Sequence, residues 1–204
     1  MVHIIDYGVG NIQAFLNVYK RLGLPCKRAR SIDDLADVTH LILPGVGSFD
    51  HALTRFSESG LRAKVEELVK VDKVPVLGIC VGMQMLATSS EEGRLPGLNW
   101  IPGRVRSFGS SPQSEALPMP HMGWNKVTFS QSSPLFKEFP DDPEFYFLHS
   151  YFFDCDDEES GLAKAGYGLN FDCIVNSGNV YGIQCHPEKS HQFGETILKN
   201  FAEL

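Results

Sequence analysis

Apolar positions in the first hundred residues follow two patterns that take turns along the chain. Short, unbroken apolar runs over residues 2–5, 40–43 and 74–79 predict buried strands, and the charged run 25–30 predicts an edge strand. Between them, apolar residues recur at helical spacing, in one helix opened by Asn11 and stopped by Gly23 and in a second helix further along. The apolar positions of these two helices are Ile12, Phe15, Leu16, Tyr19 and Leu22, and then Leu61, Val65, Leu68 and Val69.

From residue 100 onward the pattern changes to short strand candidates separated by Gly, Pro, Ser and Asn. The candidates are WNKVTF (124–129), EFYFLHSYFF (144–153), FDCIVN (171–176) and VYGIQC (180–185). The tripeptide SGN (177–179) predicts a hairpin turn between the last two, and Ile197, Leu198 and Phe201 predict a closing helix. The pattern predicts an α/β fold with a mostly parallel central sheet flanked by helices and an antiparallel extension in the second half. We expect one domain over residues 1–204.

Composition narrows the classes of partner. The net charge of −7 argues against nucleic acid or an anionic membrane surface as the main partner. Five cysteines without a CxxC pair favour neither a disulfide framework nor a structural zinc site, so we expect no metal and no cofactor. The start MVHIIDYG lacks the pattern of a secretory signal and no apolar run is long enough to span a membrane, which makes the cytoplasm the expected compartment.

The stretch VPVLGICVGMQML (74–86) places Cys80 between a buried strand and a run of helix formers. Gly78 and Gly82 flank the cysteine where backbone must pass close to backbone. Hydrolases with a G-x-S-x-G sequence use this strand-to-helix turn to expose a nucleophile, and the N-terminus of the following helix favours a thiolate. Cys80 is therefore a candidate nucleophile, although most free cysteines are simply small buried side chains.

A candidate base follows about a hundred residues later, in YGIQCHPEKS (181–190). His186 and Glu188 are two positions apart near the end of a strand, so both are expected to point to the same side. A carboxylate beside an imidazole fixes its tautomer and stabilises its cationic form, as a base for a cysteine requires. Cys185 is expected to face the opposite side and to pack in the core. Separately, His186 and Glu188 are equally consistent with a structural hydrogen bond and a surface salt bridge.

Together, GICVGMQ (78–84) and HPE (186–188) resemble the class I (triad) glutamine amidotransferase family. Further motifs narrow the resemblance to the glutaminase subunits of imidazole glycerol phosphate synthase and extend it over essentially the whole chain. These motifs are IDYGVGN (5–11), LPGVGSFDHAL (43–53), PGLNWIPGRV (96–105), PHMGWNKV (120–127), FLHSY (147–151) and HPEKS (186–190).

The resemblance implies a thioester mechanism, with Cys80 attacking the side-chain amide of L-glutamine, His186 protonating the departing ammonia and Glu188 holding His186. The oxyanion is expected to accept hydrogen bonds from the backbone N–H of Val81 and from that of Val46 or Gly47 in the PGVG loop. The family's contacts to the amino-acid end of the substrate map onto Gln84, Ser150 and Tyr151. Without the elbow, PGVG would equally be an ordinary turn and FYFLHSYFF a core strand.

The chain leaves no room for a synthase domain, so a partner chain is expected to use the ammonia. The resemblance implies a heterodimer with a (β/α)8-barrel cyclase that makes imidazole glycerol phosphate in histidine biosynthesis. Interface candidates are Asn11 and the loop residues Met122, Gly123 and Trp124, an exposed Trp beside a Met being typical of interface anchors. A buried, structural Trp124 is the alternative.

Two departures from the family pattern leave other functions open. Members of the family usually read QFHPEKSQ where this chain reads QCHPEKSH, so Cys185 replaces an aromatic residue and His191 a polar one. GVGNIQAF and KSHQFG also resemble paralogues that supply ammonia to sugar-amidating synthetases of surface-polysaccharide biosynthesis. A non-catalytic binding module that keeps the elbow cysteine is a third possibility, disfavoured because His186 and Glu188 are both present.

Overall fold

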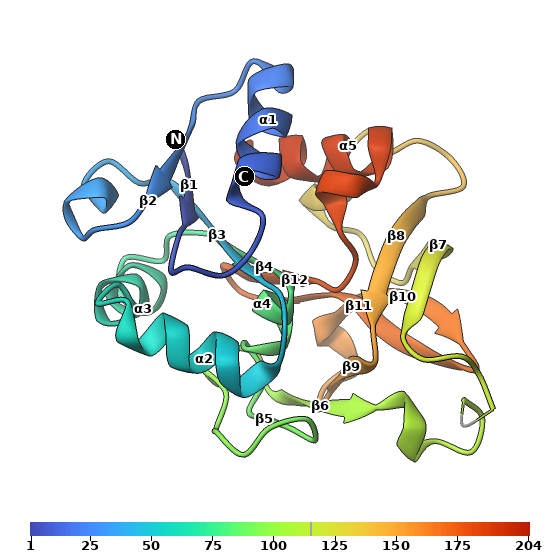
Figure 1. Cartoon of the computed structure of the whole chain (residues 1–204). Coiled ribbons are helices and arrows are strands. Elements are labelled where there is room, and N and C mark those ends of the chain that lie inside the picture. The colour runs from blue at the N-terminus through green and yellow to red at the C-terminus, as the bar shows by residue number, and fades with distance from the viewer. Residues whose placement is uncertain (115) are drawn as a thin grey trace.

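The fold is organised around one mixed sheet. Over residues 1–114 and 116–204, which are those described by the computed structural model, twelve strands join one sheet with the main order β2-β1-β3-β4-β12-β11-β10-β7-β8 (Figure 1). The strands from β2 to β12 are parallel, and from β12 onward they are antiparallel. The predicted fold class is confirmed, and β12, parallel to β4 and antiparallel to β11, is the junction between the two halves.

The parallel half alternates strands with helices, as predicted. Its strands are β1 (Val2–Ile5), β2 (Cys26–Ala29), β3 (His40–Gly45), β4 (Val76–Cys80) and β12 (Val180–Ile183). Its helices are α1 (Ile12–Leu22), α2 (Phe49–Glu58), α3 (Arg62–Lys70) and α4 (Val81–Gln84), and α5 (His191–Ala202) closes the chain. Helices α1 and α5 cover one face of the sheet and α2 and α3 the other (Figure 1). The predicted ends of α1 are confirmed, because the Asn11 side chain caps the Ala14 N–H and Gly23 is left-handed.

The antiparallel half differs from prediction in how its strands divide. Its strands are β5 (Ser89–Ser90), β6 (Gly103–Ser107), β7 (His121–Phe129), β8 (Glu144–His149), β9 (Tyr151–Cys155), β10 (Gly161–Tyr167) and β11 (Leu169–Ser177). The single strand predicted over 144–153 is wrong, because the chain breaks at Ser150. Strand β8 pairs with β7, whereas β9 pairs with β6 and β11. The hairpin at 177–179 is confirmed, with Gly178 and Asn179 between the paired residues Ser177 and Val180.

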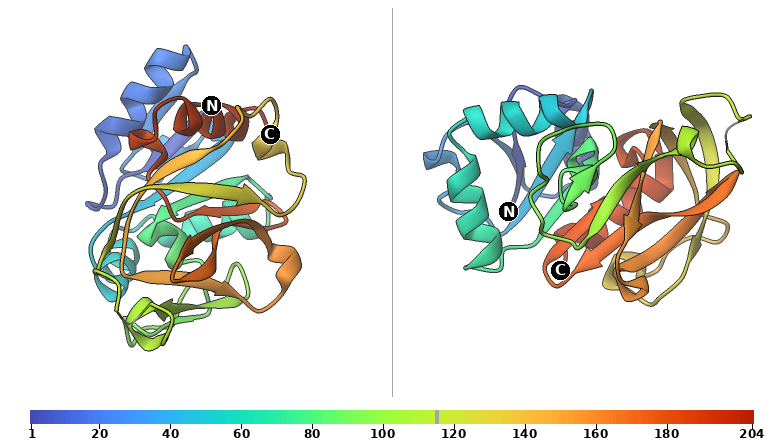
Figure 2. Two further views of the ribbon diagram at one scale, coloured as in Figure 1. Left: turned by 90° about the vertical axis from the view of Figure 1, so that its right-hand side faces the viewer. Right: turned by 90° about the horizontal axis from the view of Figure 1, so that it is seen from below.

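Short 3-10 turns connect several of these elements. They are η1 (Asp33–Leu35), η2 (Phe108–Ser110), η3 (Pro134–Phe136), η4 (Glu158–Ser160) and η5 (Pro187–Lys189). Seen from below, the blue and cyan elements of the parallel half and the yellow and orange strands of the antiparallel half lie side by side (Figure 2). Buried apolar side chains from both halves form one continuous core. The carboxyl ends of β4 and β12 meet at the junction, which is where open α/β sheets place their ligands.

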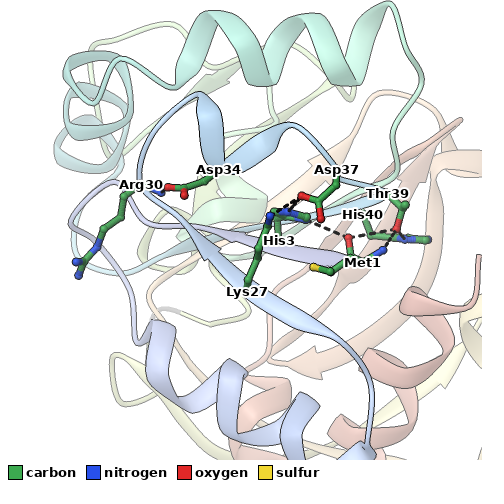
Figure 3. Close-up of polar contacts among 8 residues, drawn as sticks. All are labelled: Met1, His3, Lys27, Arg30, Asp34, Asp37, Thr39 and His40. Carbon is green, nitrogen blue, oxygen red and sulfur yellow. Dashed lines mark hydrogen bonds and ion pairs between the residues drawn. The ribbon is translucent and has the colours of Figure 1, made fainter.

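The first strands carry a polar cluster that does not contribute to this junction. His3 is buried in β1, and its ring nitrogens bond Met1 O at 3.1 Å and Asp37 Oδ1 at 3.2 Å (Figure 3). Lys27 on β2 pairs with the same carboxylate, and Thr39 bonds the Met1 terminus. Burial lowers the pKa of His3, while the hydrogen bonds to Met1 O and Asp37 oppose this shift. The cluster ties the N-terminus to the sheet and has a structural role.

Candidate active site

Cys80 lies at the end of β4 in a strained backbone conformation. Its φ of 55° and ψ of −115° are rare for a residue with a side chain, and they mark the nucleophile elbow that the sequence predicts. The turn is possible because backbone packs directly on backbone: a Cβ on Gly82 would lie 1.9 Å from Leu43 O. The elbow therefore places the Cys80 side chain at the carboxyl edge of the sheet, where it lines a cleft but is largely buried.

The helix predicted after Cys80 is only one turn long. Residues beyond Gln84 leave the helix because the carbonyls of Met85, Leu86 and Ala87 accept hydrogen bonds from the N–H groups of the segment 98–101. A helix dipole is the sum of aligned peptide units, and a single turn contributes little. The predicted stabilisation of a thiolate by this helix is therefore small, and other groups must supply it.

His186 and Glu188 form a buried pair next to the elbow. His186 Nδ1 lies 2.9 Å from Glu188 Oε1, and the two side chains are only 8% and 4% exposed. The predicted cause, alternation along a strand, is wrong: β12 ends at Ile183, and it is the 3-10 turn η5 that brings Glu188 back to the imidazole. The buried Ser190 hydroxyl fixes this turn by donating to His186 O and accepting from the Tyr146 N–H.

The environment of His186 favours its cationic form. Burial lowers the pKa of His186, but interactions with Cys80 and Glu188 outweigh it and raise the pKa to about 10. With Nδ1 bonded to Glu188, the ring presents Nε2 to the cleft that it shares with Cys80. Such a pair exchanges a proton between sulfur and nitrogen, as nucleophilic catalysis by cysteine requires.

A cleft of about 330 Å³ opens above Cys80, which is at the small end of the range for ligand sites. It brings together nearly all the predicted catalytic, oxyanion and substrate residues: Val46, Gly47, Cys80, Val81, Gln84, Ser150, Tyr151 and His186. Glu188 lies behind His186 and also lines a smaller cavity of about 70 Å³. Cys185 is buried away from the cleft, as predicted, and burial raises the pKa of its thiol well above the usual value.

The PGVG loop lies beside the nucleophile because Gly45 at the end of β3 is in register with Cys80. Gly47 has a φ of 85°, which a residue with a side chain rarely adopts, and Val46 is 43% exposed. Among the residues that the structure describes, no group accepts a hydrogen bond from the N–H of Val46 or Gly47. Both N–H groups are thus available to a developing oxyanion.

Gln84 is held by two hydrogen bonds that leave one of its atoms for a ligand. Its Nε2 donates to Tyr151 O at 3.1 Å and to Gln184 Oε1 at 3.0 Å. No described residue donates to its Oε1, so this oxygen is available to accept from the ammonium group of an amino acid. Ser150 and Tyr151, where the chain turns from β8 into β9, line the same end of the cleft.

Three residues near the nucleophile were not predicted from the sequence. Gln184 is fully buried, and its Nε2 lies 3.9 Å from Cys80 Sγ. His149 and His121 bond each other at 2.9 Å, and His149 lines the cleft. All three occur inside the motifs already singled out, QCHPEKS, FLHSY and PHMGWN, and this position within a motif is the signal that could have identified them.

The predicted interface residues lie at two separate places. Met122 and Trp124, which are 65% and 46% exposed, precede and follow Gly123 in β7. The Trp124 ring stacks on the His191 ring, with the ring centroids 5.1 Å apart. The alternative of a buried Trp124 is wrong. Asn11 is also exposed, but its side chain caps α1 and its loop borders the small cavity behind Glu188. His191, which replaces a polar residue of the family pattern, packs against Trp124.

Over residues 1–114 and 116–204, no group of three or more His, Cys, Asp or Glu side chains could hold a metal ion. Within the same ranges, no helix is both long and apolar enough to cross a membrane.

Comparison with known proteins identifies the family to which this fold and site belong. The family model "Glutamine amidotransferase class-I" matches residues 3–204. A solved structure described as a glutamine amidotransferase superposes with a TM-score of 0.73 at 20% identity, covering 100% of this chain and 99% of the other. The structure of PurLQS from Thermotoga maritima also gives a TM-score of 0.73, at 16% identity, covering 99% and 97%. At these identities the two structures show a shared fold. The chain belongs to the class-I glutamine amidotransferases.

Curated relatives define the branch of that family. The chain is 61% identical to the imidazole glycerol phosphate synthase subunit HisH of Bdellovibrio bacteriovorus and 47% identical to that of Leptospira interrogans, in both cases over the full length of both chains. It is 41% identical to subunit HisH 2 of Methanococcus maripaludis over 98% of both. Within the class it is thus a member of the HisH family.

Proposed function

We propose that the chain is the glutaminase subunit of an imidazole glycerol phosphate synthase, and that residues 1–204 act as one amidotransferase domain. The observation that carries the proposal is the buried His186–Glu188 pair, 2.9 Å between Nδ1 and Oε1, beside a cysteine held on a strained elbow. The HisH name of the full-length relatives supports the choice of synthase. It favours the cyclase as acceptor over a sugar-amidating synthetase.

In the first half of the reaction, the Cys80 thiolate attacks the side-chain amide carbon of L-glutamine. The C–S bond forms as the C=O π bond opens, and the resulting oxyanion accepts hydrogen bonds from the N–H of Val81 and of Val46 or Gly47. His186 then gives its proton to the amide nitrogen, the C–N bond breaks, and ammonia leaves. Glu188 keeps the ring oriented and stabilises its charge throughout.

In the second half, water hydrolyses the glutamyl thioester. His186, now neutral, takes a proton from the water as its oxygen adds to the carbonyl, and collapse of the second tetrahedral intermediate expels the Cys80 thiolate and releases glutamate. Throughout both halves the Gln84 Oε1 accepts from the substrate ammonium, while Ser150 and Tyr151 contact the same end of the amino acid. The two hydrogen bonds that orient the Gln84 amide support this assignment.

The ammonia is passed to a partner, because free ammonia in water at neutral pH becomes ammonium, which is not a nucleophile. The partner we propose is a (β/α)8-barrel cyclase in a heterodimer that produces imidazole glycerol phosphate. Met122 and Trp124 on β7 are the exposed apolar anchors for docking, with Gly123 between them and Asn11 at the other side of the site. Both the barrel and these contacts are proposals from family resemblance and from exposure.

The test is reconstitution with the cyclase of the same organism. Purified chain, cyclase, L-glutamine and the phosphoribosyl-aminoimidazole-carboxamide intermediate are expected to yield imidazole glycerol phosphate and glutamate in equal amounts. Glutamine hydrolysis without any product from this acceptor, together with co-purification of a sugar-amidating synthetase, would instead identify the other pathway. No glutamine hydrolysis in any complex would leave a non-catalytic binding module.

A further inference from the structure

A continuous series of hydrogen bonds leads from β7 to the sulfur of Cys80. Asn125 on β7 contacts His121 Nε2 at 3.2 Å, His121 Nδ1 contacts His149 Nε2 at 2.9 Å, and His149 Nδ1 contacts Tyr151 O at 2.7 Å. From the same carbonyl the series continues through Gln84 and Gln184 to Cys80.

The carbonyl oxygen of Tyr151 only accepts hydrogen bonds, and this determines which atom donates at each step of the series. Gln84 must turn its amide nitrogen toward it, so the other N–H of Gln84 donates to Gln184 Oε1 at 3.0 Å. Gln184 is therefore left with its amide nitrogen toward Cys80 Sγ, at 3.9 Å. If the Gln184 amide were flipped, its Nε2 would face the Nε2 of Gln84, and two donors would meet without an acceptor.

His149, at the end of the histidine part of the series, bonds the same Tyr151 carbonyl. Asn125 also donates to Gly166 O, which orients its amide so that it donates to His121. His121 and His149 must then each carry their proton on Nδ1, so that His121 donates to His149 Nε2 and His149 donates to Tyr151 O. Burial lowers the pKa of His121 to about 4 and of His149 to about 3, so neither ring changes its protonation near neutral pH.

We propose that Gln184 is a positioning residue for the nucleophile, donating a side-chain N–H to the Cys80 sulfur in an orientation fixed through Gln84 and the Tyr151 carbonyl by the neutral His149–His121 pair. The inference rests on the proposed function for the role of Cys80. Cys80 is only 4% exposed, so its thiolate has little water around it and depends on donors from the protein. With only one helical turn after Cys80, Gln184 supplies a donor that the elbow itself does not.

Gln184 has two separate roles: it accepts a hydrogen bond from Gln84 and donates one to Cys80. By accepting one N–H of Gln84, it keeps the Gln84 Oε1 turned to the cleft, where the substrate ammonium is expected. Loss of the acceptor would affect substrate binding, whereas loss of the donor would affect the reactivity of the sulfur. The two roles predict different kinetic effects for different substitutions.

The test compares Gln184→Glu, which keeps an acceptor for Gln84 but removes the amide donor, with Gln184→Met, which removes both. Asn200→Leu is the control, because Asn200 is also a buried amide but lies in α5, where its side chain donates to Leu135 O and Lys137 O. The readout is the rate of Cys80 alkylation by iodoacetamide in the full chain between pH 6 and 9, followed by mass spectrometry of the Cys80 peptide. The titratable groups around Cys80 are His186 before η5, Tyr7 after β1 and Cys185 after β12, which all variants keep. Gln184→Glu adds a carboxyl group beside the sulfur, and Gln184→Met, which adds none, is therefore the variant that reports on the donor alone.

We expect both Gln184 variants to be alkylated at least tenfold more slowly than the wild type at pH 8, and the profile of Gln184→Met to move to higher pH. In the reconstituted complex, Gln184→Glu is expected to lower kcat about tenfold with KM for glutamine within twofold, whereas Gln184→Met also raises KM. Asn200→Leu is expected to lower Tm and leave the alkylation rate unchanged. Alkylation within twofold of the wild type in both folded Gln184 variants would overturn the inference.

A measurement on the wild type covers the case in which the Gln184 variants do not fold. The side-chain N–H resonances of Gln184 are expected to shift with pH over the same range as Cys80 alkylation, and to lose that dependence in Cys80→Ala. Gln184 side-chain N–H resonances that do not shift with pH in the wild type would overturn the proposal. Neither readout needs glutamine turnover, so an inactive complex would count against the proposed function without deciding the role of Gln184.

Discussion

The cleft has two walls whose histidines are opposite in character. On the charged wall, formed by Cys80, His186 and Glu188, the imidazole is paired with a carboxylate and its pKa is raised to about 10. The neutral wall is formed by His149 and Tyr151, with His121 behind them. Among the described residues, these two rings bond each other, the Asn125 amide and the Tyr151 carbonyl, and burial lowers the pKa of His121 to about 4 and of His149 to about 3.

The difference shows that the partner of a buried histidine, rather than burial alone, decides its charge. Burial opposes the cation on both walls, and only the charged wall has an anion to offset the cost. The two kinds of histidine suit different tasks: a cation beside a cysteine can give up its proton, and neutral rings with fixed tautomers can orient neighbouring groups. The predictions below change one wall at a time.

The largest expected effect removes the nucleophile from the charged wall. Cys80→Ala is expected to abolish glutamine-dependent synthesis by the reconstituted complex, because no thioester can form. Synthesis with added ammonium salt is expected to remain at the wild-type level, since the acceptor chemistry belongs to the partner. Measuring both activities decides the matter: an equal fall in both would make Cys80 a structural residue.

Removing the carboxylate of the charged wall is the next largest change. Glu188→Gln keeps the shape of the side chain but leaves the His186 cation unpaired, so the pKa of His186 should fall and kcat for glutamine should drop on the order of 10³-fold. The pH profile of kcat is the second readout, and its alkaline limb is expected to move to lower pH. An unchanged kcat would mean that Glu188 serves only to hold η5.

Docking of the partner at β7 is expected to change the glutaminase rate about a hundredfold. No described residue accepts a hydrogen bond from the N–H of Val46 or Gly47 in the PGVG loop. Aiming one of these groups at the oxyanion only when the partner carries its acceptor requires about 2.7 kcal/mol. The chain alone is expected to hydrolyse glutamine slowly, and rates measured alone, with partner, and with partner plus acceptor analogue should rise in that order. Three equal rates would exclude this coupling.

Trp124→Ala tests the anchor in that coupling and is expected to weaken partner binding about thirtyfold, as a hot-spot aromatic does. Ile32→Ala is the matched control, because Ile32 is 54% exposed near the opposite edge of the sheet. Titration of glutaminase activity with partner measures both. Equal affinities for the two variants would remove Trp124 as an anchor.

The smallest expected effect is on stability and concerns the neutral wall. Because the folded pKa values of His121 and His149 lie below the unfolded value of 6.5, the unfolded chain binds more protons, and stability falls as pH drops from 6.5 toward 4. His186 has the opposite sign: its contribution is complete below 6.5 and is lost as pH rises toward 10. Denaturant unfolding at pH 7.5 and 5.0 should show a smaller acid loss in His121→Gln than in the wild type, by up to about 1.4 kcal/mol per pH unit. An equal loss in the two proteins would contradict the neutral wall.

Local patterns predicted the parallel half of the fold well. Strands β1, β3 and β4 there are short apolar runs, and α1 has a clear stop signal in Gly23. Helix α2 was not predicted, although Phe49, Ala52, Leu53 and Phe56 have helical spacing and are buried, because it begins directly after the glycines of PGVG, which indicate a loop. The antiparallel half was less predictable, since β10 is rich in Gly and Ala and becomes a strand only through pairing with β7 and β11.

The candidate site shows the same division between local and tertiary information. Cys80, His186 and Glu188 were found because two short motifs, GICVGMQ and HPE, occur together in the sequence. The length of α4 was not predictable, because the segment 98–101 that ends it is not part of the elbow motif. Gln184 and His149 were not predicted for the same reason: their importance lies in contacts with residues far away in the sequence, such as those of Gln184 with Cys80 and Gln84.

The backbone packing at the elbow also limits how this enzyme can be engineered. A Cβ on Gly45 would lie 2.2 Å from Gly82 N, and one on Gly78 would lie 2.6 Å from Gly82 O, so three glycines from three segments occupy one another's space. No single substitution there has a neighbour that can move aside, because each obstacle is main chain. A mutational library should therefore leave all three positions constant and vary the floor and rim of the cleft, where side chains face side chains and a change at one position can be compensated at another.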